Sequence, residues 1–335
     1  MLRQNPPVTR GRQERFCHNG KEYMDNIQKN INLAKFTTFK IGGAAKFFIE
    51  VKTKEDLLSA FSWAKEKKEK VFILAGGSNV LINDKGVNGL VIKMANTEIA
   101  VHGERLVCES GIGLSRAVSL TMSNSLSGLE WATGIPQATI GGAVWGNAGA
   151  FGFSTSELVE TVDVFNIKKA KFEILSRKDC EFSYRESKFK KDSNYLIWRA
   201  VLKLRPGRQA EIKKMINNNM EFRAKKQPKL PSAGSVFKNL KFDDLKLANL
   251  KLASLAEQEG VVKNNMIGAA WLIDMVGLKG KTIGGAKVSL EHANFIINTS
   301  GATAEDVVTL ISYIKQQIRN RFKVQLQEEV QYFGF

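Results

Sequence analysis

The sequence predicts an α+β protein built from two or three compact units, and three observations lead to this class. Strand-like and helix-like segments alternate over residues 31–95. Short strand-like segments dominate the middle of the chain, and a long amphipathic helix lies near its end. A chain of 335 residues with 43% hydrophobic residues can bury the cores of such units.

The first unit, residues 31–95, is predicted from apolar runs and one capping pattern. Lys46–Val51 is typical of a strand, and the helix after it begins beyond Thr53, with Asp56 at the capping-box position. Val71–Leu74 is short and apolar and follows a charged stretch, which indicates a buried strand. Leu90–Met94 is expected to be a further strand of the same unit.

The later elements are predicted by the same criteria. Strands are expected at 99–109, 161–167, 171–175 and 196–204, and helices at 114–125, 209–226, 269–276 and 303–322. Arg205–Arg208 contains Pro-Gly and breaks the pattern before the charged helix at 209–226. The last helix carries an apolar stripe made of Val307, Leu310, Ile311, Ile314 and Ile318.

Composition excludes several classes of protein. Cys17, Cys108 and Cys180 are far apart and form no C-x-x-C pattern, so reduced thiols in a cytoplasmic protein are expected. Three scattered histidines make a metal site unexpected. No run approaches the roughly 18 apolar residues of a membrane span, and residues 1–30 lack a secretory signal. These first 30 residues are expected to form a poorly ordered extension.

The net charge of +17 is concentrated in the middle of the chain, where residues 165–250 hold 22 Lys and Arg against 9 Asp and Glu. A basic face for nucleic acid, a funnel for small polyanions such as nucleotide cofactors, and an ordinary solvated surface would each produce this balance. No recognisable nucleic-acid motif is present, so nucleic acid is not expected as a partner. The other two explanations remain open.

Two glycine-rich stretches carry the strongest local signal. Gly134–Gly152 contains six glycines among small and β-branched residues, a composition that would weaken a helix and is too apolar for a solvent loop. It is typical either of a backbone that closely approaches a bulky ligand or of a tight buried crossing between strands. Ala75–Asn79 follows the strand at 71–74 and supplies N–H groups, a hydroxyl and an amide suited to a pyrophosphate. It matches neither the Walker loop nor the G-x-G-x-x-G turn.

Four further segments join these two in an order that identifies a resemblance. They are Phe182–Ser187, Pro231–Asn239, Gly284–Asn294 and Leu326–Val330. From about Asn32 onward the chain resembles the UDP-N-acetylenolpyruvoylglucosamine reductases, in their shorter type without an extra tyrosine loop. The resemblance implies a two-part FAD-binding region of the vanillyl-alcohol-oxidase (PCMH-like) kind, with subdomains at 31–95 and 96–206. It also implies a C-terminal α+β substrate-binding domain at 207–335.

The resemblance implies a flavoenzyme of peptidoglycan precursor synthesis. Members use NADPH to reduce FAD, which then delivers a hydride to the enolpyruvyl ether of a UDP-sugar and yields UDP-N-acetylmuramate. The expected partners are this small-molecule substrate and NADPH, in a cytoplasmic monomer.

The same resemblance assigns the catalytic residues. Arg185 matches the arginine that faces the charge developing on the substrate, and Ser235 matches the proton donor. Glu329 matches the C-terminal glutamate near the reacting carbon. Its neighbour Glu328 is the competing choice, because adjacent strand residues face opposite ways and only one can enter the site. Ser232 is expected to be structural.

Binding residues are assigned by the same match. FAD phosphates are expected at Gly76, Gly77, Ser78 and Asn79, and the flavin and ribityl chain along Gly134, Ile135, Thr139, Gly141, Gly142 and Asn147. The expected substrate contacts are Tyr184, Lys238 and Asn239, while His292 and Asn294 are either near the site or part of the core.

The chain departs from the family pattern at Gln137, which stands where glycine is usual and would be strained if the turn requires positive φ. The Trp145–Gly146 pair is also unusual there.

Two alternatives remain beside this interpretation. One is another FAD-dependent oxidase or dehydrogenase of the same superfamily, which would not need the proton donor Ser235. The other is a basic binding protein with a non-functional flavin site, for which a colourless preparation and steep salt-dependent DNA binding would be expected.

Overall fold

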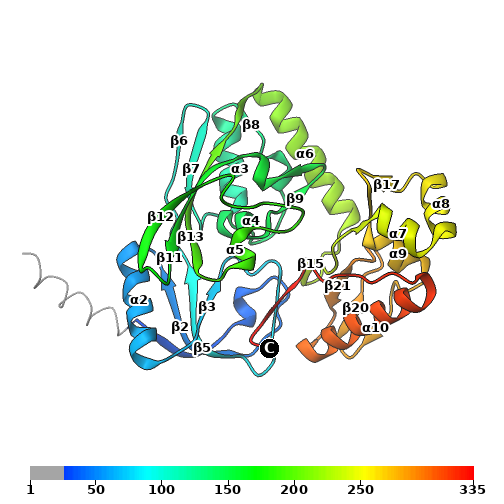
Figure 1. Ribbon diagram of the computed structural model, residues 1–335, viewed down its shortest axis with the longest axis horizontal. Helices are drawn as coiled ribbons and strands as arrows, with labels where there is room; N and C mark the ends of the chain where they lie inside the picture. The colour runs from blue at the N-terminus through cyan, green and yellow to red at the C-terminus, as the bar shows by residue number, and fades with distance from the viewer. Residues whose placement is uncertain (1–25) are drawn as a thin grey trace, which may run out of the picture.

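A mixed four-stranded sheet in the order β1-β2-β5-β3 forms the first of three lobes in the computed structural model, which describes residues 26–335 (Figure 1). Its elements are β1 (Gln28–Asn32), β2 (Ala44–Val51), α2 (Lys54–Lys67), β3 (Val71–Leu74) and β5 (Val87–Met94), with the short helix η1 at Ala34–Phe36. Strands β2 and β3 both pair in parallel with β5, so the C-terminal ends of β2 and β3 lie at the same edge of the sheet. Helix α2 has the expected capping box between Thr53 and Asp56.

Strand β1 corrects the expected limit of the N-terminal extension. Residues 28–30 were expected to be poorly ordered with the rest of residues 1–30, but Gln28 and Lys29 pair with Phe48 and Phe47 of β2. The polar sequence of β1 hides this role, because an edge strand can leave most of its side chains in solvent. The remainder of the expected extension, residues 1–25, lies outside the described residues.

The second lobe is an antiparallel five-stranded sheet in the order β12-β11-β13-β7-β6. Its strands are β6 (Ile99–His102), β7 (Arg105–Glu109), β11 (Val159–Asn166), β12 (Lys171–Ser176) and β13 (Tyr195–Lys203). The expected strand at 99–109 is thus a hairpin, broken at Gly103, which has a φ of +58°. Helices α3 (Leu114–Ser123) and α4 (Ile140–Gly146) pack on this sheet around the buried Trp131.

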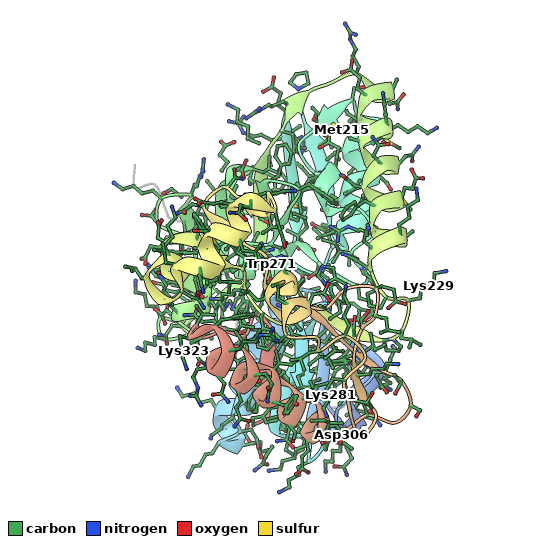
Figure 2. All side chains as sticks on the ribbon, turned by 90° about the vertical axis from the view of Figure 1, so that its right-hand side faces the viewer. Met215, Lys229, Trp271, Lys281, Asp306 and Lys323 are labelled. Atoms are coloured by element: carbon green, nitrogen blue, oxygen red, sulfur yellow. The ribbon has the colours of Figure 1, made fainter. Side chains whose placement is uncertain are left out.

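Helix α6 (Gln209–Lys226) also belongs to the second lobe by its packing. Its buried residues Ile212 and Ile216 join the core around Trp131, and the helix contacts α3 and the short strand β8 (Leu126–Ser127). It was expected within a C-terminal domain starting at residue 207, so the packing moves this helix to the preceding unit. Met215 of this helix, labelled in Figure 2, is 41% exposed.

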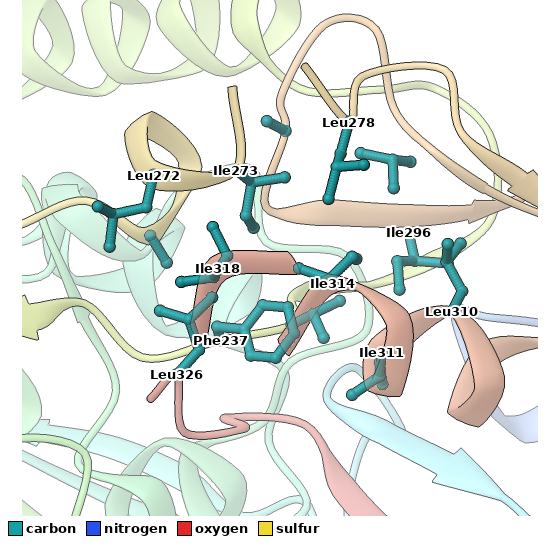
Figure 3. Close-up of a cluster of buried hydrophobic side chains, with 14 of the residues drawn as sticks. Phe237, Leu272, Ile273, Leu278, Ile296, Leu310, Ile311, Ile314, Ile318 and Leu326 are labelled. Carbon is teal, nitrogen blue, oxygen red and sulfur yellow. The ribbon is translucent and has the colours of Figure 1, made fainter. Parts of the chain in front are cut away.

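The third lobe packs a second four-stranded sheet, in the order β15-β21-β20-β19, against a long helix. Its strands are β15 (Ser232–Ser235), β19 (Thr282–Ile283), β20 (Ala286–Val288) and β21 (Phe295–Asn298), and its helices are α7 (Phe242–Ala248), α8 (Leu250–Gln258), α9 (Ala269–Met275) and α10 (Ala304–Phe322). The predicted apolar stripe of α10 is buried, and three of its residues surround Phe237 in Figure 3, namely Ile311, Ile314 and Ile318. A capping box of Thr303 and Asp306 starts this helix.

The remaining elements are short. They are β4 (Val80–Ile82), η2 (Glu130–Ala132), β9 (Gly149–Ala150), β10 (Phe153–Ser154), η3 (Thr155–Glu157), α5 (Lys188–Lys191), β14 (Arg205–Pro206), β16 (Leu240–Lys241), β17 (Val262–Lys263), β18 (Met266–Ile267) and β22 (Gln331–Phe333).

The end of the chain returns to the first lobe. Strand β22 pairs in parallel with β4, and Figure 1 shows this segment crossing back from the third lobe. A second tie is formed by Asp84, whose carboxylate accepts hydrogen bonds from the amides of Ala304 and Glu305 at the start of α10. Both contacts tie the third lobe to the first. None of the helices within residues 26–335 is long and apolar enough to cross a bilayer.

Candidate active site

The two glycine-rich stretches meet in space. A Cβ atom at Gly76 would lie 1.6 Å from the carbonyl oxygen of Gln137, so only glycine lets the two loops touch. Gly77 has a φ of +69° and lies against the carbonyl of Phe36. Gln137 itself has a φ of +54°, which confirms that the turn requires the left-handed conformation that glutamine adopts at a cost.

The loop at residues 76–79 has the donors that a pyrophosphate needs. Within residues 26–335, the main-chain amides of Gly76, Gly77, Ser78 and Asn79 donate no hydrogen bond, although Gly77 is buried. A buried N–H group is almost always paired, so the amide of Gly77 and those of its half-buried neighbours fit an anionic ligand. The phosphates of FAD match this donor set.

The stretch 134–152 contains a helix that the sequence analysis did not expect. Thr139 caps the start of α4 by accepting a hydrogen bond from Gly142, and Asn147, in the left-handed conformation, ends it. Gly141 lies against Ser110, where a Cβ would meet the serine Cβ at 2.7 Å. Tertiary packing therefore outweighs the low helix propensity of glycine. The expected lining residues Gly134 and Ile135 lie in the loop before this helix, the first with a φ of +71°.

Arg185 occupies a tight turn with a strained backbone. Ser183 and Glu186 exchange both main-chain hydrogen bonds, and Arg185 between them has a φ of +56°. This conformation is typical of glycine at the third position of a type II turn and costs free energy for other residues. The side chain of Asn147, the residue that ends α4, holds the turn, because its amide group donates to the carbonyl of Ser183 at 2.8 Å.

The guanidinium of Arg185 meets the carboxylate of Glu329 across the boundary between lobes. The Nε of Arg185 lies 2.7 Å from Oε1 of Glu329, and its Nη2 donates to the carbonyl of Gly149 at 2.8 Å. Both side chains are about one-fifth exposed. Burial raises the pKa of Glu329, and the charge of Arg185 opposes that rise.

Glu328 and Glu329 have different partners, although both lie in the segment before β22 and outside any strand. Glu328 pairs with Lys315 of α10 at 2.8 Å, away from Arg185. The backbone of Glu329 is fixed twice, since its amide donates to the carbonyl of Val236 at 2.7 Å and its carbonyl accepts from the side chain of Asn79 at 3.2 Å. Glu329 therefore lies between the glycine loop and the end of β15.

Ser235 lies at this junction. It ends β15 opposite Phe295 of β21, directly before Val236, and a Cβ at Gly234 would lie 4.0 Å from the carbonyl of Ser78. Within residues 26–335 the hydroxyl of Ser235 makes no hydrogen bond, whereas the hydroxyl of Ser232 accepts one from Gly234 at 3.5 Å. The carbonyl of Ser232 also accepts from Thr38 at 2.7 Å.

The three expected substrate residues come together in a contact between the second and third lobes. Lys238 pairs with Glu186 at 2.6 Å, and the hydroxyl of Tyr184 accepts a hydrogen bond from the amide of Asn239 at 3.1 Å. Burial raises the pKa of Tyr184. For Glu186, burial acts to raise the pKa, but Lys238 and Lys190 together lower it.

Asn294 and His292 both contact phenylalanines of the third lobe. The side chain of Asn294 is buried and bonds both main-chain groups of Phe237, so it supports the backbone after Ser235. His292 packs edge-on against Phe295, and burial lowers its pKa.

Two cations near the site were missed by the sequence analysis. Lys190 donates to the carbonyl of Arg185 at 3.1 Å, and the ring of Trp145 lies 5.5 Å from its ammonium. Arg223 of α6 lies against Gly134, with its Nη2 donating to the carbonyl of Trp131 at 3.1 Å. Its Nε is buried without a partner among residues 26–335. In the sequence, Lys190 and Arg223 stand among other basic residues, a pattern typical of a solvent-exposed surface.

Comparisons with known proteins identify the family. Residues 45–171 match the model of an FAD binding domain, and residues 226–333 match that of the UDP-N-acetylenolpyruvoylglucosamine reductase C-terminal domain. The chain is 35% identical over 309 residues to the UDP-N-acetylenolpyruvoylglucosamine reductase of Solibacter usitatus, covering 92% of this chain and 97% of that protein. It is also 35% identical to the reductase of Caldanaerobacter subterraneus, covering 94% of each.

A solved structure gives the same answer. The reductase of Thermus caldophilus superposes with a TM-score of 0.73 at 30% identity, covering 92% of this chain and 99% of that one. The fold and site together define an FAD-binding oxidoreductase with a two-part flavin region of the vanillyl-alcohol-oxidase kind and a C-terminal α+β domain. The chain belongs to the UDP-N-acetylenolpyruvoylglucosamine reductase family.

Proposed function

We propose that the protein catalyses the NADPH-dependent reduction of UDP-N-acetylglucosamine enolpyruvate to UDP-N-acetylmuramate. The observation that carries the proposal is the ion pair of Arg185 and Glu329, which forms beside the glycine loop and the end of β15. We propose further that the first two lobes hold FAD and that the third lobe, with the returning segment at 327–333, binds the substrate.

The residues present fit FAD. The amides of 76–79 would hold its phosphates, and the stretch from Gly134 to Asn147 would line the ring and ribityl chain. Bound FAD would supply the redox chemistry, by accepting a hydride from NADPH and passing it to the terminal carbon of the enolpyruvyl group.

Arg185 would stabilise the charge that this transfer creates. Addition of a hydride to the terminal carbon leaves negative charge on the neighbouring carbon and its carboxylate. The planar guanidinium suits the two oxygens of that group, and its fixed turn means that little reorganisation accompanies the reaction. The pair with Glu329 orients the guanidinium from the other side.

Ser235 would supply the proton that completes the reaction. A hydroxyl is a weak acid, so a cation would be needed to make it competent, and Lys238 and Arg185 are the candidates. Glu329 would stand near the reacting carbon. Tyr184, Lys238 and Asn239 would contact the UDP-sugar.

An anaerobic absorption experiment on the purified protein tests the proposal. A flavin spectrum should bleach with NADPH and recover when UDP-N-acetylglucosamine enolpyruvate is added. Recovery only with oxygen would favour an oxidase of the same superfamily. A protein without flavin would overturn the proposal.

The replacement Ser235→Ala tests the proton donor separately. Reduction of the flavin by NADPH should be retained, whereas reduction of the enolpyruvyl group should slow by about 10²–10⁴-fold, the usual effect of losing a positioned proton donor. Stopped-flow absorbance measures the two half-reactions. The matched control Ser232→Ala should reduce neither rate, and equal loss of both half-reactions in Ser235→Ala would contradict the assignment.

A further inference from the structure

Lys190 lies directly behind the turn that carries Arg185. It belongs to the one-turn helix α5, whose first turn is capped by the hydroxyl of Ser187. The same hydroxyl donates to the carbonyl of Trp145 at 2.6 Å, so α5 is anchored on α4. Only 14% of the Lys190 side chain is exposed, although the residue stands in a run of lysines.

The ammonium of Lys190 binds the backbone of the strained residue itself. Its Nζ lies 3.1 Å from the carbonyl oxygen of Arg185, whose φ is +56°. A strained backbone conformation persists only when its surroundings hold it. A charged donor on the carbonyl fixes the peptide plane that follows Arg185, and so fixes the direction in which the side chain leaves the turn.

The charges around Lys190 suit a structural role for its ammonium. Glu186 lies 3.5 Å away and is itself paired with Lys238, while Glu329 is the other carboxylate acting on Lys190. Burial lowers the pKa of Lys190, and the two carboxylates oppose this effect. The ammonium thus has a hydrogen-bond acceptor, the carbonyl of Arg185, and a partner charge, Glu186, within the protein itself. It does not need a ligand to complete its contacts.

We propose that Lys190 is a positioning residue that holds the turn of Arg185 so that the guanidinium faces Glu329 and the substrate. This inference rests on the proposed function, because it assigns Lys190 to the step in which Arg185 acts. Lys190 does not touch the reacting atoms and works through the carbonyl of Arg185.

The test compares Lys190→Met, Lys190→Arg and the control Lys191→Met in the FAD-loaded protein. Lys191 is exposed on the same helix, so its replacement should change nothing. For Lys190→Met, reoxidation of the flavin by the enolpyruvyl substrate should slow by about 10- to 100-fold, as expected for a misplaced catalytic group. Flavin reduction by NADPH should be unchanged, and Lys190→Arg should restore most of the lost rate.

Hydrogen exchange supplies a readout that does not depend on turnover. The amides of Ser183 and Glu186 bond each other across the turn, so their exchange reports whether the turn is held. They should exchange faster in Lys190→Met than in the wild type, and at the wild-type rate in Lys190→Arg.

The outcomes separate the two proposals. If the wild-type flavin is not reoxidised by the enolpyruvyl sugar, the proposed function fails. If it is reoxidised and Lys190→Met matches it in rate and exchange, the positioning role is wrong. Equal loss of both half-reactions, with exchange raised throughout the second lobe, would also overturn the inference, because Lys190 would then stabilise the fold at large.

Discussion

The guanidinium of Arg185 and the carboxylate of Glu329 lie 2.7 Å apart. The two charges come from different lobes. Arg185 stands in a strained turn, and the backbone of Glu329 is bound by the side chain of Asn79. Removing one member of a mostly buried pair leaves the other charge without its partner. The arrangement therefore makes each residue sensitive to replacement of its partner.

The adjacent glutamates give a prediction at this scale. Glu329→Gln should slow reduction of the enolpyruvyl group by about 10²-fold or more, as loss of a preorganised electrostatic contact does. Glu328→Gln removes only the pair with Lys315 at 2.8 Å and should leave the rate near that of the wild type. Steady-state kcat and KM for both variants provide the comparison, and the reverse order of effects would move the catalytic role to Glu328.

Helix α4 shows how an element can form against its own sequence. It contains three glycines, yet Thr139 caps its start, Asn147 ends it, and Gly141 allows it to approach Ser110. Glycine composition led to the expectation of an irregular segment, because the helix depends on contacts with Ser110 that are far away in sequence. Propensity is a weak guide where packing decides.

Two glycines of α4 provide a matched test. Gly141→Ala would place a Cβ 2.7 Å from the Cβ of Ser110 and should destabilise the protein by about 1–3 kcal/mol. Gly146→Ala meets nothing within 4 Å and should be neutral or stabilise by up to about 1 kcal/mol, since alanine favours the helix. Urea unfolding of both variants measures the difference. Equal destabilisation would mean that close packing is not the reason for Gly141.

The sequence predicted most regular elements but only part of the site. Capping boxes and apolar stripes are local, so helices α2 and α10 were expected close to their observed bounds. Helix α6 was predicted with its observed bounds, but its place in the second lobe was not, and strand β1 was missed, because a packing partner and an edge position are not local properties. Residues in short motifs, such as Arg185, were expected from the family resemblance. Lys190 and Arg223 were not, because burial alone distinguishes them from surface cations.

For the molecule as a whole, the buried thiols Cys108 and Cys180 can report whether the second lobe unfolds, because both lie in its core. Burial raises the pKa of both Cys108 and Cys180 to about 12, so at pH 8 nearly all of each thiol is protonated and unreactive. In a Cys17→Ser background, an alkylating reagent should label them only when the second lobe unfolds. Added FAD should slow labelling, since a ligand of the folded state reduces opening. Mass spectrometry of labelled peptides measures this, and rapid labelling in the folded protein would contradict it.

The pairing of β22 with β4 has a consequence for how the protein is made. Asn79 and Glu329 touch, yet they are 250 residues apart in the chain. On the ribosome the glycine loop and β4 emerge early, and they wait for their partners until almost the entire remaining chain has been translated. The candidate site is therefore among the last features to form during biosynthesis, and a nascent chain lacking residues 329–333 has neither the carboxylate facing Arg185 nor the strand that covers β4.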